Sequence, residues 1–326
     1  MKFSANQNRN GTILLALASI IWGSSFVPQR VAMQHMHPFT FTATRFLLGA
    51  ITLLPLLLFL NRDKSKNPDN PSKKNEQKMY LKAGLLCGGL LFMAVSFQQY
   101  GMQTTEAGKA GFLSSMYVVI VPLLGFFIGK RVRKAVWLGV LLAVAGVYLL
   151  SFTNQLRIER GDLIVLMGTV FWAAHILMLD RFLPEVDGLS LAIMQFLVAG
   201  IIALGAALII DKPELTQIRD GLWTILYSGI VVVGGGYTLQ VLGQKSIHPT
   251  IAAIVMSTES VFAVFFGWIL LGENLSGREL AGCALMFVAV LVAQLPVFGS
   301  KSPRKPNYPS LPADINEIES SQQTRD

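Results

Sequence analysis

One apolar segment occurs twice in the chain, as GTILLALASIIWGSSFVPQR (residues 11–30) and as GDLIVLMGTVFWAAHILMLD (residues 161–180). A shift of 150 positions aligns the two copies and pairs Trp22 with Trp172. Self-similarity over so long an interval indicates a chain built from repeated units. Each copy has the length that an α-helix needs to cross a lipid bilayer, roughly 20 residues. We therefore predict two related halves that each begin with a membrane-spanning helix.

The whole chain has the composition of a membrane protein. Charged residues make up 14% of its 326 residues, against about 25% in a typical soluble domain. In hydrocarbon the backbone groups must be bonded within their own segment, so long continuous apolar runs are helices. We therefore predict an all-α membrane protein with ten transmembrane helices. Their predicted positions are residues 12–32, 38–60, 82–102, 108–129, 134–152, 161–180, 188–210, 220–243, 249–271 and 277–297.

The ten predicted helices divide into two repeats of five. Because five is an odd number, the second repeat enters the membrane upside down relative to the first. Inverted repeats of this kind are typical of secondary transporters, which bind their substrate near the middle of the bilayer. The predicted parts are an N-terminal arm (1–11), a first five-helix repeat (12–152), a second five-helix repeat (161–297) and a disordered tail (298–326).

The distribution of Lys and Arg predicts the orientation of the chain. These residues number 19 in the segments on the side of the N-terminus and 7 in the loops on the other side. Short cytoplasmic loops carry the excess of positive charge, so both termini are predicted to be cytoplasmic. Membrane lipid is the predicted partner of the basic segments. No basic segment is interleaved with aromatic residues for base stacking, so a nucleic-acid partner is not predicted.

Four stretches carry the pattern of a known family: IIWGSSF (20–26), TATRFLLGA (42–50), QTTEAGKAGFLSSMYVVIVPLLG (103–125) and TESVFAVFFGWILLGE (258–273). They resemble the EamA-type transporters of the drug/metabolite transporter superfamily, over about residues 11–297. The resemblance implies a ten-helix carrier of small organic metabolites, with a central cavity lined chiefly by helices 1, 3, 4, 6, 8 and 9. The chain departs from the family pattern at Ser260, where many relatives have Pro, and at Lys130, where the first half often ends in Gly-Glu.

Three ionisable side chains lie within predicted helices, where a charge costs about 2.5–3.5 kcal/mol on insertion scales. For Glu259 we weigh a countercharge to a substrate ammonium or a proton carrier against a purely structural carboxyl. Arg45 is predicted to anchor its helix near the outer surface or to form an ion pair between helices, with contact to an anionic substrate group as the alternative. His175 is either a hydrogen-bonded core residue or a donor in the cavity and a second proton site.

Polar and aromatic side chains recur at helical spacing in several of the predicted helices. Tyr237 and Gln240 lie three residues apart, and a shift of 142 pairs Gln98 with Gln240, which would face each other across the repeat axis. The alternative is that such side chains only hold helices together by hydrogen bonds. The predicted substrate-binding residues are Trp22, Ser25, Gln98, Ser114, Tyr117, Trp172, His175, Tyr237, Gln240 and Glu259.

The predicted function is a secondary transporter that exports small organic metabolites, such as amino acids, across a bacterial inner membrane. An intramembrane enzyme is an alternative, but the sequence has no HExxH motif or phosphate-binding loop and only one deep carboxylate. A channel or a structural membrane protein is the other alternative. No cofactor or metal site is predicted, Cys87 and Cys283 are predicted core residues, and the formation of a homodimer is left open.

Overall fold

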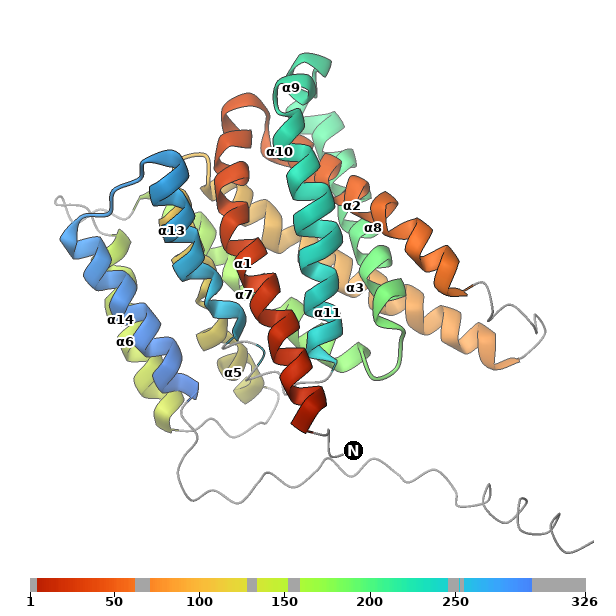
Figure 1. The fold of residues 1–326 in the computed structure, drawn as a ribbon, viewed down its shortest axis with the longest axis horizontal. Helices are drawn as coiled ribbons and strands as arrows, with labels where there is room; N and C mark the ends of the chain where they lie inside the picture. Colours follow the sequence, from red (N-terminus) through yellow and green to blue (C-terminus); the bar gives the residue numbers. More distant parts are fainter. Residues whose placement is uncertain are drawn as a thin grey trace, which may run out of the picture. The chain divides into compact units, whose positions relative to one another are not determined.

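The computed structural model describes residues 5–61, 71–127, 134–151, 159–245, 252 and 255–294. Every regular element in these ranges is a helix, as the composition predicted. The helices belong to one compact unit, Met1–Gln294 (Figure 1). The predicted tail, residues 298–326, lies outside the described residues.

The helices follow the predicted order along the chain, and α1 begins at Ala5, within the predicted arm. The first half contains α1 (Ala5–His35), α2 (Pro38–Asn61), α3 (Pro71–Gly101), α4 (Ala107–Ser115), α5 (Tyr117–Phe127) and α6 (Lys134–Ser151). The second half contains α7 (Arg160–Phe182), α8 (Gly188–Ala206), η1 (Ala207–Asp211), α9 (Leu215–Asp220), α10 (Leu222–Leu226), η2 (Tyr227–Tyr237), α11 (Thr238–Gln244), α13 (Glu259–Leu271) and α14 (Gly277–Gln294).

Six segments of the described residues are long and apolar enough to cross a membrane. They are Arg9–His35, Pro38–Phe59, Gln77–Gly101, Arg160–Phe182, Gly188–Asp211 and Leu222–Gln244. Shorter apolar helices occur at Ala107–Val121, Trp137–Gly146, Val255–Leu271 and Leu280–Ala289. Many large apolar side chains point outward, such as Phe59 and Ile209, and such a surface is stable in lipid rather than in water. The chain is therefore a multi-pass membrane protein.

Two apolar segments predicted as continuous helices are interrupted. Met116 separates α4 from α5, and its amide bonds to the carbonyl of Leu113 in a tight turn. Thr258 precedes α13, and its amide bonds to the carbonyl of Val255 in the same way. Among the residues that the structure describes, the predicted spans 108–129 and 249–271 therefore each contain a turn at these points. The interruptions place Tyr117 and Glu259 at the first positions of α5 and α13.

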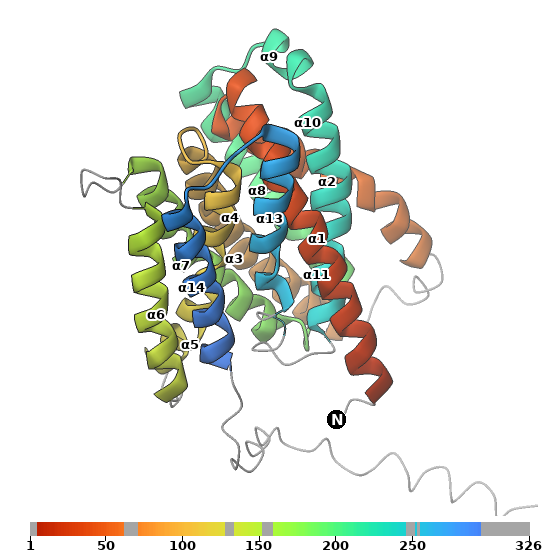
Figure 2. The same cartoon turned by 60° about the vertical axis from the view of Figure 1, so that its left-hand side comes forward.

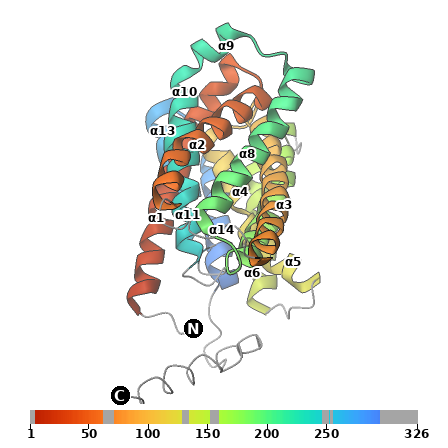
Figure 3. The same ribbon diagram turned by 90° about the vertical axis from the view of Figure 1, so that its right-hand side faces the viewer.

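The helices pack in pairs that join the two halves of the chain. α6 lies against α14 at one edge (Figure 2), and α1 packs against α13. α3 packs against α7 and also lies beside α8, as Figure 3 shows for α8. The α1–α13 contact depends on Gly23, because a Cβ there would overlap the Cβ of Phe262 and lie 2.7 Å from the carbonyl oxygen of Glu259. This close approach brings the first residues of α13 to the middle of α1, at the centre of the bundle.

Candidate functional site

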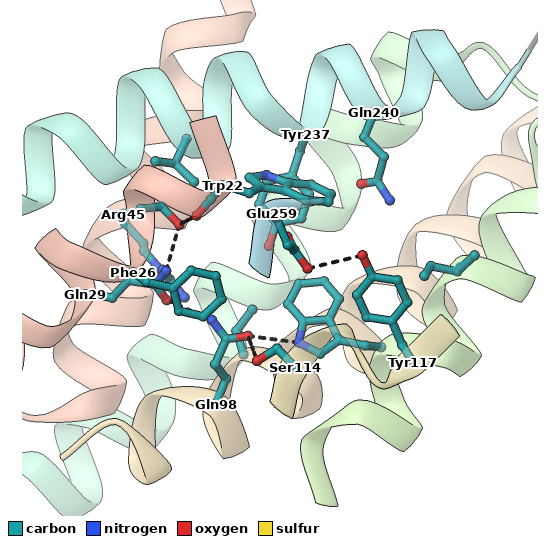
Figure 4. A pocket seen from close by; sticks show the side chains of 15 residues that line it. Trp22, Phe26, Gln29, Arg45, Gln98, Ser114, Tyr117, Tyr237, Gln240 and Glu259 are labelled. Atoms are coloured by element: carbon teal, nitrogen blue, oxygen red, sulfur yellow. Dashed lines mark hydrogen bonds between the residues drawn. The ribbon is translucent and has the colours of Figure 1, made fainter. Parts of the chain in front are cut away.

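A buried cavity of about 40 Å³ lies between the two halves. A cavity needs at least about 10–15 Å³ on this measure to hold one water molecule, so this one holds only a few. Its lining side chains come from both repeats (Figure 4). The lining residues are Trp22, Ser25, Phe26, Gln29, Arg45, Val95, Gln98, Ser114, Tyr117, Trp172, Ile176, Val232, Tyr237, Gln240 and Glu259.

The structure brings together every predicted substrate-binding residue except His175. Ser25 lies on α1, and its hydroxyl donates to the carbonyl of Trp22 at 2.6 Å. Gln240 is 1% exposed, and its Oε1 has no hydrogen-bond partner among the described residues. An unpaired buried acceptor costs about 1–3 kcal/mol, so this oxygen is a point at which a bound polar group would be stabilised.

Gln98 is the centre of the hydrogen-bond network on one wall of the cavity. Its Oε1 accepts from the indole Nε1 of Trp172 at 3.0 Å and from the hydroxyl of Ser114 at 3.4 Å. Its Nε2 donates to Oε1 of Gln29 at 3.2 Å, and Gln29 in turn donates to the hydroxyl of Ser25 at 2.9 Å. The network thus ties α1, α3, α4 and α7 together and orients their polar groups around one space (Figure 4).

Glu259 is 5% exposed and faces the cavity from the start of α13. Its Oε1 accepts a hydrogen bond of 3.1 Å from the hydroxyl of Tyr117, the first residue of α5. The break at Thr258 gives this carboxyl a position at a helix N-terminus, where the partial positive charge of the helix dipole favours a carboxylate. The local fold therefore supplies two stabilising features for a charge at this depth.

Arg45 is 3% exposed and lines the same cavity. The expectation that it reaches toward the membrane surface is wrong, because its guanidinium carbon lies 4.9 Å from the centre of the Phe41 ring and 5.2 Å from that of Phe46. Its Nε has no hydrogen-bond partner, and no carboxylate within the described ranges forms an ion pair with it. Cation–π contact with these rings offsets part of the cost of burial.

Aromatic rings surround Tyr237 on η2. Its ring centre lies 5.0 Å from that of Trp22 and 6.2 Å from that of Trp172, with the second pair stacked. Phe46 and Phe196, which a shift of 150 also pairs, lie 6.0 and 5.6 Å from the same ring. Residues that the repeat relates therefore meet around one tyrosine, and Trp22, Trp172 and Tyr237 give the cavity its aromatic wall.

His175 does not line the cavity. It is fully buried, and its Nε2 shares a hydrogen bond of 2.8 Å with Oε1 of Gln195 on α8. Its ring also packs edge-on against Trp172, with 6.0 Å between centres. Of the two roles considered from the sequence, the structure places His175 as a hydrogen-bonded core residue, and its expected place in the cavity wall is wrong.

Gln29 is a cavity residue that the sequence reasoning missed, together with the apolar Phe26, Val95, Ile176 and Val232. Gln29 lies seven residues after Trp22 and four after Ser25, so the three share one face of α1. Tyr237 and Gln240 on the eighth predicted helix are related by the same three-residue step as Trp22 and Ser25. This spacing is the signal in the sequence that points to Gln29.

The bundle is closed by charged side chains at the end where α3 ends and α4 and α7 begin, which we call the α4 end. Lys109, 5% exposed, lies 3.2 Å from Oδ2 of Asp162 and 3.3 Å from Oε2 of Glu159. The hydroxyl of Thr105 donates to Asp162 at 3.0 Å. Glu273, after α13, accepts from the backbone amides of residues 107 and 108 at 2.8 and 3.0 Å. The N-terminus of α4 is thus capped by a residue of the other half.

Cys87 and Cys283 are buried core residues, as predicted, at 0% and 5% exposure. The described residues contain no group of three His, Cys, Asp or Glu side chains that could hold a metal ion.

The polar groups around the cavity are amides, hydroxyls, indoles and two single charges. Such a set suits reversible binding by hydrogen bonds and charge.

The chain is similar to several known proteins. The model of the EamA-like transporter family matches residues 9–152 and again 159–294. An uncharacterized transporter of Archaeoglobus fulgidus is 31% identical over 287 residues, which cover 87% of this chain and 85% of the relative. The uncharacterized inner membrane transporter YedA of Escherichia coli strain K12 is 27% identical over 284 residues, 84% of this chain and 87% of the relative.

A solved crystal structure with 19% sequence identity superimposes with a TM-score of 0.63 and covers 86% of this chain and 96% of its own. At that identity the match shows the fold alone. The family match covers both halves of the chain and most of their length. The chain belongs to the EamA-like transporter family.

Proposed function

We propose that the protein is a secondary transporter that exports small organic metabolites, such as amino acids, across the bacterial inner membrane by alternating access. The observation that carries the proposal is the buried cavity, because it is lined by polar and aromatic side chains from both halves. A site between two repeats is the arrangement on which alternating access depends, since rocking one repeat against the other exposes it to each side in turn.

The helix directions support an inverted repeat. α1 runs parallel to α13, because Ser19 bonds to the carbonyl of Val255 and Gly23, further along α1, lies close to Glu259. α13 runs antiparallel to α4, since the start of α4 meets the end of α13 at Glu273. α4 and α7 both begin at the α4 end, as the Lys109–Asp162 pair requires. α7 is therefore opposed to α1, its repeat counterpart, and we propose ten transmembrane helices in two inverted repeats.

The size of the cavity supports a contracted state of the transport cycle. A space for a few water molecules is too small for an amino acid, so the helices around it must separate to take one up. At the α4 end the buried Lys109–Asp162 pair holds α4 to α7, and the partly buried Glu273 holds α13 to α4. With both termini proposed to be cytoplasmic, the α4 end is the outer end, and its contacts form the closed outer gate.

The energy source is proposed to be a gradient of the substrate or of an ion. The sequence has no phosphate-binding loop for ATP. Glu259 is the proposed coupling residue, because its carboxyl is buried, faces the cavity and has one neutral hydrogen-bond partner, Tyr117, among the described residues. A carboxyl that alternately binds a proton and releases it can link the two fluxes.

The test is a counterflow assay with purified protein in sealed proteoliposomes. When unlabelled solute inside is in large excess over labelled solute outside, a carrier transiently accumulates the label above its external concentration. A channel only equilibrates the label, and an enzyme or a structural protein does neither. The Glu259→Gln variant should lose the pH dependence of exchange while remaining folded, and the exposed Glu214→Gln should retain it. Unchanged pH dependence in Glu259→Gln would remove the coupling role, and absence of counterflow for every solute would remove the transporter.

A further inference from the structure

We infer that the cavity is a two-point site for a zwitterion, in which Arg45 binds a carboxylate and Glu259 binds an ammonium group. The inference rests on the proposed function, because it names the substrate class of the same site. Its basis is that a buried cation and a buried anion line one cavity from two different helices, α2 and α13 (Figure 4).

Arg45 has unused capacity for an anion. Its guanidinium carries five N–H donors, and its Nε has no hydrogen-bond partner although it is buried. The rings of Phe41 and Phe46 lie beside it and stabilise the positive charge but accept no strong hydrogen bond, and the phenol of Tyr237 lies near enough to interact with it electrostatically. A carboxylate entering the cavity would supply two parallel N–H···O bonds, the strongest pairing available to Arg.

Glu259 has matching capacity for a cation. A carboxylate accepts about four hydrogen bonds, and Tyr117 supplies one of them, to Oε1. No Lys, Arg or His of the described ranges forms an ion pair with it. The indole of Trp22 and the ring of Tyr237 line the same space and lie tilted against each other, at 5.0 Å between centres. Their faces can add cation–π attraction for an ammonium group.

The two charges are not repeated in the other half. A shift of 150 places Gln195 at the position of Arg45, and a shift of 143 places Met116 at the position of Glu259. Two pairs of cavity residues are duplicated, Trp22–Trp172 and Gln98–Gln240, but the cation and the anion each occur once. A ligand with one carboxylate and one ammonium group therefore has a single preferred orientation in the cavity.

Charge balance gives the specificity. Arg45 and Glu259 together carry no net charge, and a zwitterion adds none, so the filled cavity stays neutral. An amine without a carboxylate leaves the cavity with an excess positive charge and Arg45 unpaired. A carboxylic acid without an amine leaves an excess negative charge and Glu259 unpaired. Leaving a buried charge without its partner costs about 2–5 kcal/mol, which corresponds to at least about a 30-fold loss of affinity.

The experiment measures competition in counterflow by purified full-length protein in proteoliposomes. The probes are L-alanine, L-leucine and L-phenylalanine, each with the amine that lacks its carboxylate and the acid that lacks its ammonium group. For the wild type, at least one zwitterion should exchange, and both of its singly charged analogues should be at least about 30-fold weaker. Equal exchange of a zwitterion and either analogue overturns the inference.

Two variants assign the charges to their groups. In Arg45→Gln the preference for the zwitterion over its amine should fall at least about 10-fold while the preference over its acid remains, and Glu259→Gln should show the reverse pattern. Arg45→Lys, which retains the charge, should keep the preference for the carboxylate. The exposed pair of controls, Arg219→Gln and Glu214→Gln, should leave both preferences unchanged.

The outcomes separate this inference from the proposed function. If Arg45→Gln or Glu259→Gln fails to fold, the wild-type preference and the Arg45→Lys variant still decide the question. If either glutamine variant weakens the zwitterion, amine and acid equally, the residue is structural and the inference is overturned. Exchange of some other solute with none of the three zwitterions also overturns it, while the transporter remains. Counterflow of no solute at all removes the transporter itself.

Discussion

Replacing Glu273 by Gln should loosen the α4 end of the protein and shift it toward a state that is open there. In the structure the two carboxylate oxygens of Glu273 each accept one backbone amide of α4, at 2.8 Å and 3.0 Å. The side chain of Glu106, which precedes α4, makes no capping hydrogen bond. The carboxylate of Glu273 therefore satisfies the start of α4 from a position 166 residues away along the chain.

The free energy by which Glu273 stabilises the closed α4 end follows from the number and type of these hydrogen bonds. A hydrogen bond to a charged group contributes about 1.5–3 kcal/mol, and a neutral one about 1 kcal/mol. A carboxylate at a helix N-terminus adds about 0.3–1 kcal/mol through the helix dipole. Glutamine keeps one acceptor and loses the second acceptor and the charge. Because Glu273 is only partly buried, we take the lower values and expect a loss of about 2 kcal/mol, or about 30-fold in the closing equilibrium.

The assay reports exposure of the cavity to one side of the membrane. A single cysteine is placed at Ser114, which lines the cavity and is 3% exposed, in a chain whose buried Cys87 and Cys283 are replaced by alanine. A membrane-impermeant thiol reagent is then added to the outside of right-side-out vesicles. The labelling rate is proportional to the population open at that end, so it should rise about 30-fold with Glu273→Gln.

An independent change at Gly267 should have the same effect. A Cβ at this position would lie 2.6 Å from Oε2 of Glu273, so Gly267→Ala must displace the carboxylate from the amides without removing its charge. Glu214→Gln, an exposed change on the same half, is the control and should leave labelling unchanged. If labelling of the cysteine is the same in wild type, Glu273→Gln and Gly267→Ala, the cap does not hold the end closed and the reasoning is refuted.

Three further changes test other parts of the structure. Asp162→Asn should lower stability in detergent by about 1–3 kcal/mol, since Lys109 loses its fully buried partner but keeps Glu159, and an unchanged unfolding temperature would contradict this. Gln98→Ala should raise the half-saturating concentration in counterflow about 10-fold, because Trp172 loses its 3.0 Å acceptor; unaltered kinetics would count against a role for this amide in the site. Gly23→Ala should cost about 1–3 kcal/mol by forcing α1 away from α13, and a melting curve that matches the wild type would disprove that close packing.

The sequence predicts the helical class and much of the cavity because both depend on patterns within one helix. Lipid-length apolar runs identify the helices, and polar residues at helical spacing identify the inner faces of those helices. The repeat adds a constraint between distant positions, since Trp22 and Trp172 had to occupy related places. In the structure both rings pack against Tyr237.

The features that the sequence did not predict depend on contacts between helices. The turns at Met116 and Thr258 have neither Gly nor Pro at the break, so no local signal distinguishes them from continuous helix. Arg45 is buried because other helices pack around α2 and form the cavity that it lines, whereas the Phe41 and Phe46 rings beside its guanidinium lie on α2 itself. His175 is removed from the cavity by Gln195, a partner on another helix whose importance is visible only when the two are packed together.

The duplicated architecture explains why the charges matter more than the amides for choosing a ligand. Duplication places the same kinds of group on two sides of the cavity in the pairs Trp22–Trp172 and Gln98–Gln240, and these groups by themselves do not favour one of two opposite orientations of a ligand. Arg45 and Glu259 each break that symmetry once. A carrier must close around its substrate from both sides, and this favours symmetry in the walls of the cavity. It must also distinguish one metabolite from another, and this requires asymmetry in the groups that bind the metabolite. Because the asymmetry lies in two buried charges, the cavity can distinguish ligands by the charged groups that they carry. The paired side chains in its walls can meanwhile stay alike in the two halves.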